Sequence, residues 1–129
     1  MVIGGFTDPE GSRNGFGALL LGYHTKDGLF CAGKVGTGFN NALLKTLYAR
    51  LKKLGVKECP FTNLPEKRTG RFGSGITASV MKRCHWVKPE LVCQVKFAEW
   101  TRDGKLRHAV FLGLREDKSP KSVIREVPI

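Results

Sequence analysis

Long hydrophobic runs are missing from this sequence of 129 residues, and with them the usual marks of a membrane or secreted protein. Apolar runs such as 18–21 are short, whereas a membrane-spanning helix needs roughly 20 apolar residues. The N-terminus has no charged segment followed by a hydrophobic one, so we expect no signal peptide. The sequence therefore predicts no membrane partner and a cytoplasmic location.

Cysteine is sparse and widely spaced. The four cysteines, Cys31, Cys59, Cys84 and Cys93, form no Cys-x-x-Cys pair. A zinc site usually shows such pairs, because two ligands from one turn restrict the geometry. Cys84 and His85 together could supply two ligands, but nothing else is spaced to complete the set. We therefore expect reduced thiols and no metal site.

Histidine and acidic residues are also few. The three histidines, His24, His85 and His108, are not accompanied by clustered carboxylates, so no general acid–base or nucleophilic set is visible. Only 11 Asp and Glu oppose 22 Lys and Arg, which gives a formal net charge of +11. Nucleic acid is the commonest partner for such a chain, although a merely basic soluble surface would have the same composition.

Apolar patterning predicts short strands in the first half and the last third of the chain. Asp27-Gly28 and Asp103-Gly104 are typical of hairpin turns, since glycine tolerates the positive φ that these turns require. Leu91–Phe97 shows the period-two alternation of a half-buried strand. Strands are predicted at 2–6, 17–23, 28–35, 91–97 and 106–114.

A single longer helix is predicted between these two groups of strands. Asn40 or Asn41 can cap it, because a side-chain oxygen there accepts a hydrogen bond from a free backbone N–H. Leucines then recur at helical spacing, and Gly55 is placed to end the helix.

Two segments lack such periodicity. Residues 57–88 are basic and interrupted by proline and glycine, which indicates a long surface connection with a possible short helix at 77–83 capped by Thr77. Residues 119–129 are polar and flanked by proline, so we expect a tail or linker there. The folded domain is accordingly predicted to span 1–118.

Several short strands around one or two helices suit a small, mainly β barrel. The OB-fold, a five-stranded partly open Greek-key barrel, has this architecture and binds nucleic acid through its strand faces and loops. Periodicity alone leaves an SH3-like barrel as an alternative.

Six segments of the chain form a recognisable series: 2–7, 32–39, 70–71, 81–86, 97–101 and 107–118. The last of them closes with Arg115-Glu116-Asp117-Lys118, which looks like the last nucleotidyltransferase motif of ligases and capping enzymes. Together these segments resemble a known family over nearly the whole chain, the C-terminal OB-fold domain of bacterial ATP-dependent DNA ligases of the ligase D type, which act in non-homologous end joining.

The resemblance implies that this chain is one part of a two-part enzyme. In the family, a separate nucleotidyltransferase domain carries the Lys-x-Asp-Gly motif whose lysine becomes adenylated, and that motif is absent here. ATP and Mg²⁺ would be bound mainly by that separate domain, and no cofactor is expected in this chain alone. The parent protein would be a DNA ligase, whereas the isolated chain should not seal DNA.

The family implies two roles for this domain. Arg115 and Lys118 would stabilise charge on the leaving phosphates of ATP, while Asp117 would hold the loop or pair with Arg115. Lys34 and Thr37, in the glycine-rich stretch 33–38, are the first candidates for contacts to duplex DNA at a nick, although a bulged strand end would explain the same glycines. Further DNA-binding candidates are the arginines Arg13, Arg68 and Arg71.

Alternatives remain open at this point. A free-standing OB-fold protein for single-stranded nucleic acid would present exposed aromatic side chains, whereas we expect Trp86 and Trp100 to belong to the core. The matching domain of an RNA ligase or capping enzyme shares the closing motif. The expected partners are nicked double-stranded DNA and the nucleotidyltransferase domain, and we expect a monomer near the bacterial nucleoid.

Overall fold

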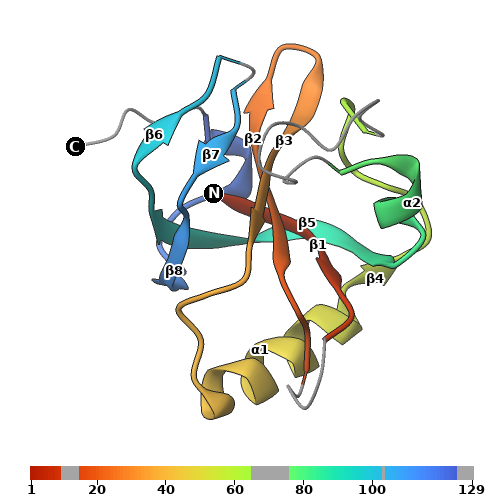
Figure 1. The fold of residues 1–129 in the computed structure, drawn as a ribbon, viewed down its shortest axis with the longest axis vertical. Helices are drawn as coiled ribbons and strands as arrows, with labels where there is room; N and C mark the ends of the chain where they lie inside the picture. Colours follow the sequence, from red (N-terminus) through yellow and green to blue (C-terminus); the bar gives the residue numbers. More distant parts are fainter. Residues whose placement is uncertain (10–14, 65–75, 103, 125–129) are drawn as a thin grey trace.

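Short antiparallel strands and two α-helices make up the part of the chain that the computed structural model describes, residues 1–9, 15–64, 76–102 and 104–124 (Figure 1). The mainly β composition is therefore confirmed. In chain order the elements are β1 (Val2–Thr7), β2 (Leu19–Thr25), β3 (Gly28–Val35), α1 (Asn41–Lys53), β4 (Gly55–Val56), α2 (Ala78–Met81), β5 (Cys84–Lys96), β6 (Glu99–Trp100), β7 (Leu106–Arg107), β8 (Val110–Leu114) and the 3₁₀ helix η1 (Pro120–Ser122).

The main sheet has the strand order β3-β2-β1-β5-β4, and β8 pairs with the second half of β5. Strand β5 is long enough to pair with β4 through its first half and with β8 through its second half. Its ladder with β1 is interrupted between Trp86 and Leu91. That interruption contains Pro89, which has no N–H to donate to a ladder. The sheet curls until the Phe111 N–H of β8 donates to the Thr37 carbonyl just after β3, at 3.0 Å, which nearly closes a barrel.

Helix α1 lies across one end of the sheet, opposite the β2–β3 turn (Figure 1). The Asn40 side chain caps it by accepting from the Leu43 N–H at 2.7 Å. Gly55 follows the last turn and begins β4. The helix buries three leucines at helical spacing, Leu44, Leu47 and Leu51, against the β-barrel core.

The last predicted strand, 106–114, is divided in two. Leu106–Arg107 pairs with β6, whereas Val110–Leu114 pairs with β5. Between them His108 has a φ of 56°, a left-handed conformation for which histidine is among the better-tolerated side chains. The strand breaks because its two halves have different partners, which apolar patterning does not reveal.

The predicted connection at 57–88 also differs from the structure. Phe61 is buried, and the Asn63 side chain accepts from the Cys31 N–H at 2.8 Å, so this part packs on the edge of β3. Helix α2 is present with Thr77 at its N-cap, and β5 already begins at Cys84, four residues before the predicted end of the connection. Residues 65–75 lie outside the described part.

The predicted tail begins as folded structure. Helix η1 starts at Pro120, one residue after the predicted start of the tail. The Val123 side chain is fully buried, and the Val123 carbonyl accepts from the His24 N–H at 2.8 Å. Regular structure and buried side chains therefore continue past residue 118, as far as Val123. A polar sequence does not show that one valine fills a site beside β2. Residues 125–129 lie outside the described part.

Candidate nucleic-acid and nucleotide interface

The segment Arg115–Lys118 directly follows β8. The Arg115 N–H donates to the Val92 carbonyl at 2.7 Å, which extends the ladder between β5 and β8 to the start of the segment. The Arg115 guanidinium meets the Asp117 carboxylate at 3.2 Å, and the Arg50 guanidinium of α1 meets Glu116 at 2.7 Å. Backbone pairing thus fixes one end of the segment, and an ion pair joins it to α1.

These ion pairs change the acidity of both carboxyl groups. The hydrogen bond from Arg115 lowers the pKa of Asp117, and the one from Arg50 lowers the pKa of Glu116. Both carboxylates lie in solvent, where such pairs are weak and screened by salt. The Arg115 side chain is 37% exposed, so the segment presents a guanidinium that solvent reaches.

The glycine-rich stretch 33–38 leaves β3 and turns toward β8. The Lys34 side chain is exposed, and so is Thr37. Gly38 has a φ of 97°, and a Cβ atom there would overlap the Phe111 carbonyl oxygen. This glycine therefore has a structural reason, close packing of two backbones at the barrel seam, independent of any ligand.

Lys34 and Arg83 line a small cleft of about 210 Å³ at the end of β1. They approach it from β3 and from the residue before β5, and Asp8 lines the same cleft. Arg13, Arg68 and Arg71, the remaining DNA-binding candidates, lie outside the described residues.

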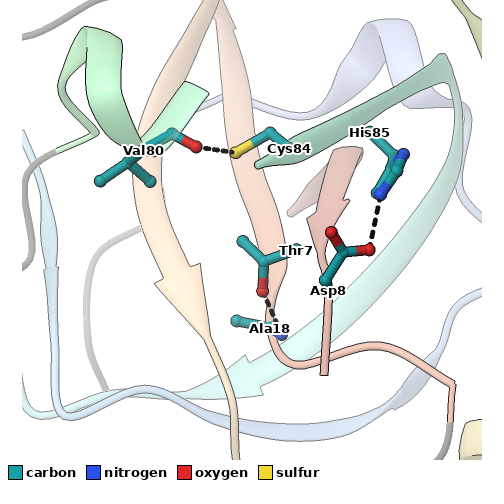
Figure 2. A network of polar contacts seen from close by, with 6 residues as sticks. All are labelled: Thr7, Asp8, Ala18, Val80, Cys84 and His85. Atoms are coloured by element: carbon teal, nitrogen blue, oxygen red, sulfur yellow. Dashed lines mark hydrogen bonds and ion pairs between the residues drawn. The ribbon is translucent and has the colours of Figure 1, made fainter. Parts of the chain in front are cut away.

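A larger cleft of about 630 Å³ adjoins it, because Asp8 lines both. Figure 2 shows His85 directed at Asp8, with the His85 Nε2 atom 2.7 Å from the carboxylate. The imidazole is also stacked on the Phe6 ring, with the ring centroids 4.9 Å apart. The cleft is lined by Phe6, Asp8, Tyr48, Leu51, Lys52, Gly55, Val56, Lys57, Cys84, His85 and Trp86.

Sequence reasoning did not identify this cleft. Its residues come from β1, α1, β4, β5 and the residues just after β1 and β4, and the pairing of Phe6 with His85 brings the end of β1 beside the start of β5. The one signal in the sequence was the basic character of the second half of α1, which favoured an ordinary solvated helix face.

Cys84 lies at the edge of this cleft, where its Sγ donates to the Val80 carbonyl at 3.2 Å (Figure 2). Burial raises the pKa of the Cys84 thiol, and the nearby Cys59 adds to the shift. All four cysteines are free thiols. Across the described ranges, no group of three or more His, Cys, Asp and Glu side chains is placed to hold a metal ion.

The two tryptophans differ in setting, although both are only partly buried. Trp100 packs edge-on against Tyr23 and Phe97. Trp86 lies near Phe61, with the ring centroids 6.3 Å apart, and also lines the larger cleft. Both pack against the hydrophobic core, as expected. Because each is only partly buried, however, core packing accounts for only part of each side chain.

Comparison with known proteins decides the family. Residues 12–118 match the family model described as the ATP dependent DNA ligase C terminal region. The chain belongs to this family. All four residues of the closing segment lie inside the matched range of the ligase C-terminal region, whereas the folded residues 119–124 lie beyond it.

Similar proteins carry this ligase C-terminal region within much longer chains. The chain is 45% identical to the multifunctional non-homologous end joining protein LigD of Pseudomonas aeruginosa, over 98% of its own length and 14% of the relative's. It is 42% identical to LigD of Mycolicibacterium smegmatis, over 98% and 15% of the two chains. The chain therefore spans about a seventh of the length of these relatives.

Solved structures confirm the OB-fold. The ligase domain of Mycobacterium tuberculosis LigD matches with a TM-score of 0.81 and 38% identity, over 97% of this chain and 37% of that one. A mycobacterial DNA ligase D complexed with ATP and MES matches with a TM-score of 0.76 and 39% identity, over 97% and 36%. Among the described residues, no helix is long and apolar enough to cross a membrane.

Proposed function

We propose that this chain is the OB-fold module of a bacterial ATP-dependent DNA ligase that acts in non-homologous end joining. In this proposal the module contacts nicked duplex DNA and also closes over a separate nucleotidyltransferase domain, which assists adenylation of that domain's lysine. The observation that carries the proposal is the 45% identity to an end joining LigD over almost the whole chain. A repair role of this kind would place the protein, as a monomer, near the bacterial nucleoid.

The donor set of the closing segment fits a polyphosphate. Arg115 offers a planar guanidinium and Lys118 an ammonium, the two groups that most often bind phosphate oxygens in proteins. ATP would supply the adenylyl group. Arg115 and Lys118 would orient the leaving pyrophosphate and stabilise the negative charge that develops as its bond to the α-phosphate breaks.

Asp117 and Glu116 would act on the position of these cations. The 3.2 Å contact between Asp117 and Arg115 limits the directions in which the guanidinium points. The Arg50 to Glu116 pair holds the same segment against α1. Neither carboxylate is suited to touch phosphate, because like charges repel. Mg²⁺ would be held mainly by the separate domain.

Contacts to DNA would come from the other basic residues. Lys34 and Thr37 are exposed beside the barrel seam, and Lys34 shares its cleft with Arg83. Such contacts would meet phosphates and would be largely independent of base sequence. Arg13, Arg68 and Arg71 remain candidates for the same role.

The closing role is tested by Arg115→Ala in a ligase reconstituted with the nucleotidyltransferase domain. We expect the rate of enzyme adenylation to fall about a hundredfold, because one hydrogen-bond donor to the negative charge developing on the phosphates is lost. Sealing of pre-adenylated nicks should fall much less. Arg107→Ala is the matched control, because Arg107 is similarly exposed and ion-paired, with Glu99 at 2.6 Å. Equal losses in both steps would contradict the division of roles.

A further inference from the structure

The larger cleft has an aromatic wall that is separate from the closing segment, and part of its ring surface is not covered by the core. The side chains of Phe6, Tyr48, His85 and Trp86 all line it. Phe6 meets the Tyr48 ring edge-on at 5.7 Å and the His85 ring face-on, so Tyr48 and His85 both pack against one buried ring. His85 is 50% exposed, and Tyr48 and Trp86 are partly exposed, so ring surface remains open to solvent in a concave place.

The rim of this cleft is positively charged. Lys52 and Lys57 line it and are exposed, and within the described residues neither has a carboxylate partner. The Lys52 ammonium lies 5.4 Å from the centre of the Tyr48 ring. Among the described residues that line the cleft, Asp8 is the only acidic one, and its carboxylate lies 2.7 Å from the His85 Nε2 atom. An anionic ligand is therefore favoured.

The positive charge continues beyond this cleft. Asp8 also lines the smaller cleft, whose cationic side chains are Lys34 and Arg83. Each of the two clefts that share Asp8 therefore has its own pair of cations, Lys52 and Lys57 in the larger and Lys34 and Arg83 in the smaller. Figure 2 shows the Asp8–His85 pair itself, with Asp8 just after the end of β1 and His85 at the start of β5.

Aromatic faces inside a positively charged groove are the combination with which proteins bind single-stranded nucleic acid, because bases stack on the rings and phosphates meet the cations. A cleft of about 630 Å³ lies within the range of pockets that enclose small ligands of nucleotide size. A phosphodiester chain extending from it would meet Lys34 and Arg83 next.

We propose that the larger cleft binds one unpaired nucleotide of a single-stranded DNA segment, such as a strand end. The base lies against Tyr48 and Trp86, its phosphates contact Lys52 and Lys57, and the adjoining phosphate lies near Lys34 and Arg83. This site is separate from the closing segment and does not depend on its role. It gives the module a contact to unpaired DNA in addition to the proposed duplex contacts.

The chain offers its own reporter for this site. Of the two tryptophans, only Trp86 lines the cleft, so Trp100→Phe leaves a single tryptophan beside the proposed base. We expect a short oligothymidylate to quench the fluorescence of this variant in a saturable way, because a stacked base contacts the indole. A blunt duplex of the same strand length should quench it much less.

Charge variants separate the cleft from general basicity. Lys52→Gln with Lys57→Gln should weaken oligothymidylate binding about tenfold, since two phosphate contacts are lost. Lys45→Gln with Lys53→Gln is the matched control, because it removes the same charge from exposed positions of α1 that do not line the cleft. The control should change the affinity less than about twofold, as long-range charge alone predicts at physiological salt.

Removal of the aromatic wall gives an independent measurement. Tyr48→Leu should weaken binding at least about fivefold through loss of stacking, and its thermal unfolding reports whether the fold is kept. The inference is overturned if quenching is absent, if the blunt duplex quenches equally, if both lysine pairs have the same effect, or if an acidic aromatic peptide binds here and the oligonucleotide does not. None of these results alters the adenylation assay on Arg115, so failure of either proposal can be recognised separately.

Discussion

At the scale of single residues, three glycines show how differently one residue type is used in this fold. Gly38 has both a left-handed φ of 97° and a close contact with Phe111. Gly33 has a φ of 125° but open space around the position of a Cβ atom. Gly113 has neither a positive φ nor a neighbour within 4 Å of that position. The three positions therefore allow the effect of a positive φ to be separated from the effect of steric overlap.

Alanine at these positions should separate backbone strain from steric overlap. Gly113→Ala should leave the free energy of unfolding unchanged within about 0.5 kcal/mol. Gly33→Ala should lower it by about 1 kcal/mol, from strain alone, and Gly38→Ala by about 3 kcal/mol, because overlap with backbone adds to the strain. Urea denaturation of the three variants measures this order, and equal values for Gly33→Ala and Gly38→Ala would contradict the proposed seam contact.

At the scale of elements, the segment after β8 is part of the fold. Helix η1 ends beside Val123, whose side chain is fully buried and whose carbonyl accepts a bond from β2. The next residue, Ile124, is 63% exposed. Val123 and Ile124 are adjacent branched aliphatic residues, one buried and one exposed, so each serves as the control for the other.

Truncation of the buried member of this pair should destabilise the domain. Val123→Ala should lower the free energy of unfolding by about 2 kcal/mol, because it removes buried methyl groups and leaves a cavity. Ile124→Ala should change it by less than about 0.5 kcal/mol. Chemical denaturation checks both, and a Val123→Ala variant as stable as Ile124→Ala would mean that the segment does not pack in solution.

The elements that the sequence predicted well are those with local causes. The β2–β3 hairpin follows from Asp27-Gly28 between two apolar runs, and α1 follows from a cap and a leucine stripe. The break at His108 and the early start of β5 depend instead on which strand each residue pairs with, a nonlocal property.

The candidate sites divide in the same way. The closing segment is contiguous, so a family motif identifies Arg115–Lys118 from the sequence alone. The aromatic cleft is assembled from residues near positions 6, 48 and 85, which become neighbours only when β1 pairs with β5 and α1 packs below them. Neither the composition nor the residue spacing of the sequence predicts that these residues become neighbours.

At the scale of the whole molecule, the chain has 22 basic and 11 acidic residues, and this net positive charge would govern its binding to DNA in the proposed function. Contacts to phosphates release counterions, so the affinity of such a protein falls steeply with salt. Long-range attraction from the net charge speeds encounter but does not specify a site. A residue in the interface is therefore distinguished by its effect on the salt slope rather than by affinity at one salt concentration.

Lys34 and Lys26 provide this test on duplex DNA. Both are exposed lysines of the β2–β3 hairpin, but Lys34 lies at the barrel-seam end of β3 and Lys26 in the turn at the other end. If Lys34 meets one phosphate, Lys34→Gln should make the slope of log affinity against log salt shallower by about 0.9. Lys26→Gln should weaken binding slightly through net charge and leave that slope unchanged. Fluorescence anisotropy on a nicked duplex across a salt series measures both, and an unchanged slope for Lys34→Gln would remove Lys34 from the DNA interface.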